Sequence, residues 1–268
     1  MKGKNNPDYL PSYKNPPIIE VVCGITFERL SEFKAPHLGL FWDKILLEFP
    51  KCEHAVPLGP IPAALELSHF PLPRIWFIHK NEDRVIQIQD DRFLYNWRRI
   101  RPDDVYPRFE KVMDGFKDNL QKFAKFVDEA GLGAVNPVEC ELAYINHIPG
   151  SQGWESVKDV GLVLPDLNWR SDEARFLPDP VNMGWKALFD FEDKGRLSVD
   201  LKQGTRKIDK QEILVLELKA TGIGPDKSID TVWEWYEMAR KWIVCGFADL
   251  TGKKIQTEVW QREDSDAA

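Results

Sequence analysis

The sequence has few cysteines and no long apolar run. Its four cysteines stand far apart, each in or beside an apolar segment, at Cys23, Cys52, Cys140 and Cys245. This placement is typical of reduced, buried thiols, and a disulfide framework is not expected. Cys52 lies two positions from His54, but no second pair of ligands completes a zinc site. We therefore expect no bound metal and no cofactor.

No apolar run reaches the roughly 18 residues that span a membrane. The first residues, Met1 to Pro17, are polar and rich in proline, where a signal peptide would need an apolar stretch. These two absences predict a cytoplasmic protein without a membrane partner.

Basic residues are fewer than acidic ones. The chain carries 43 acidic and 36 basic residues, for a formal net charge of -7. Such a field repels a phosphate backbone, so nucleic acid would need a local basic patch. The balance favours a protein partner.

Catalytic motifs are missing as well. The sequence contains no Gly-x-Ser-x-Gly elbow, and no histidine is placed by pattern beside a serine or cysteine. The glycines of Thr221 to Pro225 lack the spacing of a phosphate loop. We expect no catalytic residues and no enzyme activity.

Apolar residues are plentiful, at 43% with 12% aromatic, which is enough for a full core. Strand patterns occur at Ile18 to Phe27, and in three short runs between Arg74 and Arg98 that suggest an antiparallel meander. Helical spacing predicts a short helix over 36–49 and a long one between Pro107 and Gly131.

A second set of elements follows about 120 positions later. Asn136-Pro137 repeats the Asn-Pro signal at Asn15, and the strand Ile213 to Ala220 takes the place of Arg92 to Arg99. A long helix, Ile229 to Ala248, ends this set as well. The sequence predicts an α+β fold of two similar halves, each a strand, a helix, an antiparallel meander and a long helix, with the helices on one face of the sheets. The expected boundaries are a flexible arm over 1–15, halves over 16–133 and 134–262, and a disordered tail over 263–268.

Strand alternation divides the side chains of the run Arg92 to Arg99 between two faces. The aromatic residues are expected in the core. The polar side chains of this run share a face with amide groups of a neighbouring strand. This face is either solvated or a binding surface for a peptide backbone, a carboxylate or a base edge, and its residues are Gln87, Gln89, Asn96 and Arg98. Arg98 and Arg99, with aromatic neighbours, leave RNA or single-stranded DNA binding as the second choice.

A Mg²⁺-dependent nuclease is a further alternative. Asp200 precedes the strand that carries Glu217 and Lys219, and two carboxylates with an amine can hold Mg²⁺ and orient water. Alternating Glu and Lys is also ordinary on an exposed strand.

The sequence contains ten tryptophans, a residue that indicates packing or interaction surfaces more than catalysis. Trp235 and Trp242 are seven residues apart and so share a helix face. We expect this face to contribute indole either to a protein interface or to packing against the other half.

Four short motifs carry a family resemblance. They are Asn-Pro-Pro-Ile-Ile-Glu-Val-Val from Asn15, Gln87-Ile88-Gln89 with Asn96-Trp97-Arg98-Arg99, Tyr106-Pro107, and Leu142 to Asn146. Together they resemble a sporadically distributed bacterial family without a settled biochemical function. The last motif adds Tyr144 and Asn146 to the candidate binding residues. The resemblance implies an accessory protein of a defence locus, CRISPR-associated or toxin-antitoxin-like, and supplies no catalytic residues. The leading hypothesis is a non-catalytic protein that binds a partner from its own locus.

Overall fold

The computed structural model describes residues 10–58, 72–169, 175–206, 209–224 and 229–263. The strands are β1 (Ser12–Tyr13), β2 (Ile18–Phe27), β3 (Lys51–Ala55), β4 (Arg74–Ile78), β5 (Arg84–Gln89), β6 (Arg92–Arg98), β7 (Pro137–Pro149), β8 (Gly184–Asp190), β9 (Arg196–Thr205), β10 (Glu212–Gly222) and β11 (Arg262–Glu263). The α-helices are α1 (Ala35–Ile45), α2 (Phe109–Glu129), α3 (Val160–Val163), α4 (Ile229–Leu250) and α5 (Lys253–Glu258).

The strands form a nine-stranded sheet in the order β3-β4-β5-β6-β2-β7-β10-β9-β8, and β1 pairs with β11 separately. A repeat is visible in this order. The first half runs β2, α1, β4 to β6, α2 with strand order β4-β5-β6-β2, and the second runs β7, α3, β8 to β10, α4 with order β8-β9-β10-β7. The prediction of an α+β fold with two similar halves is confirmed. In the described part of the chain, the first half has a fourth meander strand, β3, at the edge of the sheet, and the second half has none.

Spatial contacts divide the chain into two compact units, which are described separately below. Unit 1 consists of Met1–Ile19, Ala143–Ala220 and Tyr236–Ala268, and unit 2 of Glu20–Leu142 and Thr221–Trp235. These limits differ from the expected boundary at 133 and 134, because Met1–Ile19 belongs to unit 1, whereas residues 134–142 and Thr221–Trp235 belong to unit 2. The boundary at 133 and 134 between the two halves of the sequence repeat therefore stays a prediction.

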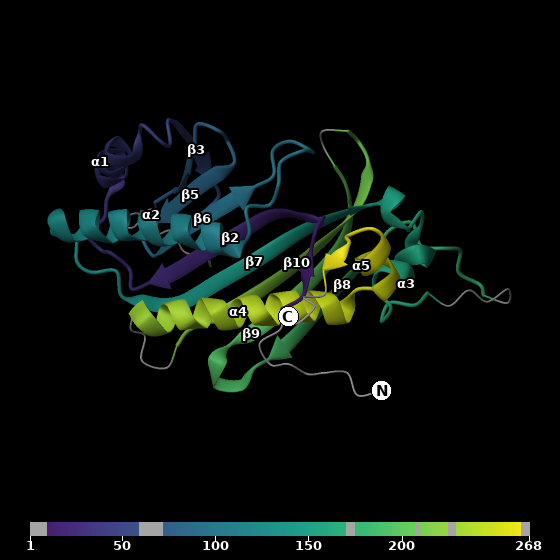
Figure 1. The fold of residues 1–268 in the computed structure, drawn as a ribbon. Helices are drawn as coiled ribbons and strands as arrows, with labels where there is room; N and C mark the ends of the chain where they lie inside the picture. Colours follow the sequence, from purple (N-terminus) through teal and green to yellow (C-terminus); the bar gives the residue numbers. More distant parts are fainter. Residues whose placement is uncertain (1–9, 59–71, 170–174, 207–208, 225–228, 264–268) are drawn as a thin grey trace. The chain divides into compact units, whose positions relative to one another are not determined.

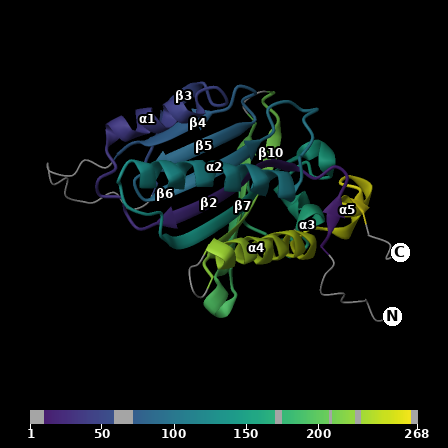
Figure 2. The same ribbon diagram turned by 60° about the vertical axis from the view of Figure 1, so that its left-hand side comes forward.

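In unit 2, α1 and α2 cover one face of the meander (Figures 1 and 2). Phe116 and Phe123 of α2 are fully buried, and Phe93 of β6 lies 6.2 and 5.4 Å from their ring centroids. Burying a phenylalanine side chain stabilises the fold by about 1.5–3 kcal/mol. The helix ends where the spacing predicts, because Gly131 takes a φ of 64° that suits glycine.

In unit 1, the part of α4 from Tyr236 onward lies along β9 and β10 (Figure 1). A Cβ atom at Gly246 would come within 3.1 Å of Leu197 in β9, so glycine allows the helix to approach the sheet closely. The apolar side chains on this side of α4 are buried as well: Ala239, Ile243 and Phe247.

The expected arm, 1–15, is partly docked. Ser12 and Tyr13 pair with β11, and Tyr13 is buried against Phe247 and Trp260, with ring centroids 5.6 and 6.2 Å away. Residues 1–9, and residues 264–268 of the expected tail, lie outside the described part of the chain.

Within the described ranges, no helix is both long and apolar enough to cross a membrane.

Candidate functional site

The polar residues expected on the meander do share one face of unit 2. The register pairs Trp76 with Gln87 and Val85 with Asn96, so these side chains lie on the same side of the sheet. Tyr95 points to the other side, where its hydroxyl occupies the place a Cβ atom at Gly115 of α2 would take. We call the side away from α1 and α2 the open face of unit 2.

A chain of hydrogen bonds crosses this open face. Arg74 Nη1 donates to Gln87 Oε1 over 3.0 Å, and Gln87 Nε2 donates to Asn96 Oδ1 over 2.8 Å. Asn96 Nδ2 then donates to Glu20 Oε1 over 2.6 Å. Gln87 and Asn96 are only 5% and 4% exposed, and these two buried amides have hydrogen-bond partners in each other, in Arg74 and in Glu20.

The remaining polar candidates of the meander have separate partners. Gln89 is held by the backbone of Leu58, which donates to its Oε1 over 3.0 Å and accepts from its Nε2 over 3.2 Å. Arg98 donates to the Glu82 carbonyl over 3.1 Å. Burial lowers the pKa of Arg99. The negative charge of Asp104 acts in the opposite direction and raises this pKa. Arg98 is the last residue of β6 and lies on the open face, and Arg99 follows the end of the strand.

Three further candidates are core residues. Tyr144, Asn146 and Trp235 are 5%, 1% and 1% exposed. Asn146 Nδ2 donates to the Leu216 carbonyl over 3.0 Å, which satisfies a buried amide next to a sheet carbonyl. These three side chains are thus as buried as Gln87 and Asn96, and for Trp235 this agrees with the packing alternative. Their role in binding stays a prediction.

The residues of the nuclease alternative lie on neighbouring strands of unit 1, Asp200 on β9 and Glu217 and Lys219 on β10. Asp200 accepts from Lys202 at 2.9 Å and lies 3.2 Å from Lys186. Burial acts to raise the pKa of Asp200, but the two lysines hold it below its ordinary value. Lys202 also feels the charge of Glu217. No group of three His, Cys, Asp or Glu side chains that could hold a metal ion occurs among the described residues.

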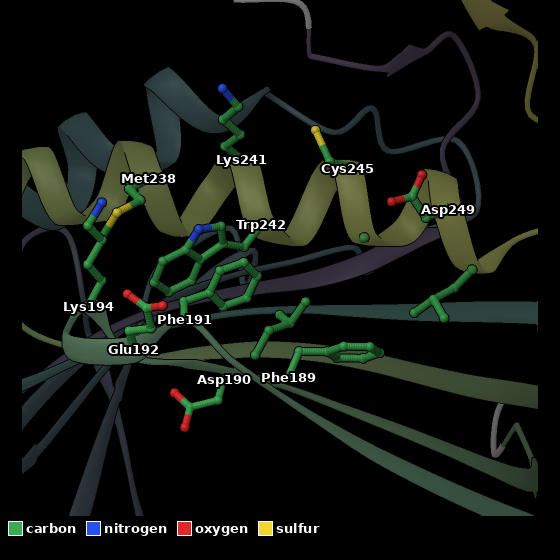
Figure 3. Close-up of a pocket in the computed structure, with 13 residues that line it drawn as sticks. Phe189, Asp190, Phe191, Glu192, Lys194, Met238, Lys241, Trp242, Cys245 and Asp249 are labelled. Carbon is green, nitrogen blue, oxygen red and sulfur yellow. The ribbon is translucent and has the colours of Figure 1, made fainter. Parts of the chain in front are cut away.

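A cavity of about 780 Å³ lies in unit 1, between α4 and the turn that joins β8 to β9 (Figure 3). Its walls are largely apolar, with the following residues around it: Phe189, Asp190, Phe191, Glu192, Lys194, Leu197, Met238, Lys241, Trp242, Cys245, Gly246, Asp249 and Leu250. We call this cavity the α4 groove.

Trp242 forms part of the floor of the α4 groove. Its indole points from α4 toward the turn and stacks on Phe191, with the ring centroids 4.1 Å apart (Figure 3). Of the two tryptophans that the sequence singled out, this one lies where a partner can reach it. Burial, followed by the charge of Asp249, raises the pKa of the Cys245 thiol, which disfavours the thiolate in the groove wall.

The strand beside the groove is an edge strand. β8 ends the strand order, so its outer edge has no strand partner within the described residues. Leu188 and Phe189 of β8 are 61% and 41% exposed. In register, Phe189 pairs with Leu197, on the side of the groove, and Leu188 pairs with Ser198, on the opposite side. Sequence reasoning missed β8, although the short apolar run Ala187-Leu188-Phe189, with Trp185 before it, is consistent with a strand.

Comparison with known proteins yields little. No protein-family model and no curated protein matches the chain. Among solved structures, the chain is similar to Methanococcus jannaschii TBP at 14% sequence identity, covering 87% of this chain and 97% of that one, with a TM-score of 0.30. A likeness at this level supports no conclusion about function.

Proposed function

We propose that this chain is a non-catalytic accessory protein that binds an extended segment of a protein partner along the edge strand β8. The observation that carries the proposal is the conjunction of a seven-residue strand at the sheet edge, two exposed apolar side chains on it, and the α4 groove next to it.

An open edge offers a row of backbone donors and acceptors on which another strand can form. Proteins usually protect such edges with charge, and here the central charge of β8 is Lys186, which is drawn to Asp200 at 3.2 Å. The exposed Leu188 and Phe189 then leave apolar surface on both sides of the edge. In strand addition the backbone supplies affinity, and pockets for alternate side chains supply specificity.

The α4 groove supplies such a pocket. Phe189, Trp242 and Met238 line it with apolar surface, which suits a large apolar side chain of the incoming segment. The proposed partner segment is therefore extended and carries a large apolar residue.

The family resemblance alone suggests the biological context of this binding. In that context, the chain is an accessory protein of a bacterial defence locus, and its partner is encoded by the same locus.

The nucleic-acid alternative has less support from the geometry. A nucleic acid backbone needs several phosphate contacts, and Arg98 has the acidic Glu20 as its strand neighbour in register, so the charge around it is mixed. Arg99 follows the last residue of β6, and burial lowers its pKa.

Partner binding with matched variants tests the proposal. The partner is first recovered with the tagged chain from its host, with and without nuclease, and then purified. We expect Leu188→Lys and Phe189→Lys to weaken its binding at least tenfold. Leu47→Lys, at an equally apolar and 92% exposed position elsewhere, should bind as the parent does. Equal binding by all three variants, or loss of the partner on nuclease treatment, would contradict the proposal.

A further inference from the structure

The open face of unit 2 holds a second feature, which does not depend on β8 or on the proposed function. Two guanidinium groups flank one indole there. The guanidinium carbon of Arg74 lies 5.6 Å from the ring centroid of Trp76, and that of Arg98 lies 6.0 Å from it. Both distances are within the range of cation–π contact.

Each of these three side chains has a buried nitrogen without an acceptor. They are Arg74 Nε, Trp76 Nε1 and Arg98 Nε, and none has a hydrogen-bond partner among the described residues. Buried donors are nearly always satisfied in native proteins, and those that are not call for an ion, a water or a ligand. Three such donors, on an indole and the two guanidinium groups in contact with it, point to an acceptor from outside the described residues.

The two arginines are fixed in place by other bonds. Arg74 Nη1 donates to Gln87 and Arg98 Nη2 donates to the Glu82 carbonyl, so each guanidinium is anchored through one nitrogen and leaves Nε for another acceptor. The buried Gln87 and Asn96 form the layer beneath them. Such support holds a binding geometry before the ligand arrives.

Charge on this face favours an anion. Burial lowers the pKa of Arg74, the positive charge of Arg92 lowers it further, and Glu141 acts to raise it. Glu20, the other acid on the face, already accepts from Asn96. Guanidinium groups match phosphate and carboxylate oxygens in geometry, and an indole N–H is only a donor.

We propose that Arg74, Trp76 and Arg98 form a binding site for an oxyanion group, the phosphate or carboxylate of a small ligand. The corresponding face of unit 1 differs, because Lys186 and Lys202 are both drawn to Asp200 there. The site is thus a property of the first half and not of the repeat.

Nuclear magnetic resonance of the ¹⁵N-labelled full chain tests this site. The Trp76 indole N–H signal is assigned with Trp76→Phe, which keeps an aromatic ring and removes the donor. Inorganic phosphate and acetate are the two probes. We expect a saturable shift of the Trp76 signal with at least one of them, and the tighter of the two identifies the ligand as a phosphate or as a carboxylate.

The arginine variants complete the test. Arg74→Gln with Arg98→Gln should weaken the response at least tenfold, whereas Arg101→Gln, which removes an exposed arginine of the same unit, should not change it. The proposal is overturned if neither probe gives a saturable shift in the parent, in which case water satisfies the donors, or if the double variant responds as the parent does. The parent titration decides the question even where the double variant does not fold.

Discussion

The indole of Trp242 lies parallel to the phenyl ring of Phe191, with the ring centroids 4.1 Å apart and the planes inclined by 6°. This contact joins α4 to the turn between β8 and β9 and forms part of the floor of the α4 groove. It fixes the end of the edge strand next to the pocket that the proposed partner would use.

Replacing Phe191 with leucine tests how much this stack contributes. Leucine keeps apolar surface but loses the ring pair, and we expect the free energy of unfolding to fall by about 0.5–1.5 kcal/mol. Chemical denaturation measures the change. Phe176→Leu, at a position that is 97% exposed, should leave stability unchanged, and a similar loss in both variants would argue against a specific stack.

The amide chain on the open face of unit 2 should be sensitive to loss of one member. Asn96→Ala removes the acceptor of Gln87 Nε2 and the donor to Glu20. A buried polar group left without a partner costs about 1–3 kcal/mol, and we expect denaturation to show a loss of this size. Gln121→Ala, an exposed amide on α2, is the control and should change stability little.

Two helical glycines should respond in opposite directions to alanine. Gly115→Ala places a Cβ atom against the Tyr95 hydroxyl, and overpacking of this kind costs about 1–3 kcal/mol. Gly39→Ala in α1 meets nothing within 4 Å, and alanine should stabilise that helix by about 0.5–1 kcal/mol. Thermal unfolding of both variants checks the signs. A melting temperature lowered by Gly39→Ala, or unchanged by Gly115→Ala, would contradict the packing described for these helices.

The sequence predicted the meander, α2, the repeat and the division of β6 into two faces. Each of these depends on the local periodicity of apolar residues or on the turn and proline residues between elements. It missed β3, whose five residues, Lys51–Ala55, have no apolar alternation and form a strand through pairing with β4. It also could not show that Asn96 bonds Gln87, since that contact depends on the register between strands. Trp235 and Trp242 share a helix face as their spacing indicates, yet one is buried and the other borders the groove. Tertiary packing decides that difference.

The cluster around Asp200 predicts a pH dependence of stability. Lysine contacts depress the pKa of Asp200 in the folded chain, so its contribution is present above the unfolded pKa of about 3.9 and is lost as pH falls through the folded pKa. Asp200→Asn should therefore destabilise the chain at neutral pH, and the difference from the parent should shrink in acid. Denaturation from about pH 2 to about pH 7, which extends below the ordinary carboxylate pKa, measures this, with the exposed Asp103→Asn as a control. A difference that does not vary with pH would show that the ion pairs contribute no charge-dependent stability.

Hydrogen exchange at β8 tests the central claim most directly. The full chain is measured alone and in complex with the purified partner, following the backbone amides of Gly184–Asp190. Strand addition predicts that the amides on the outer edge of β8 exchange at least tenfold more slowly in the complex, with slower exchange at Trp242 and its neighbours in α4. Unchanged exchange throughout β8, with protection only elsewhere on the chain, would contradict the account.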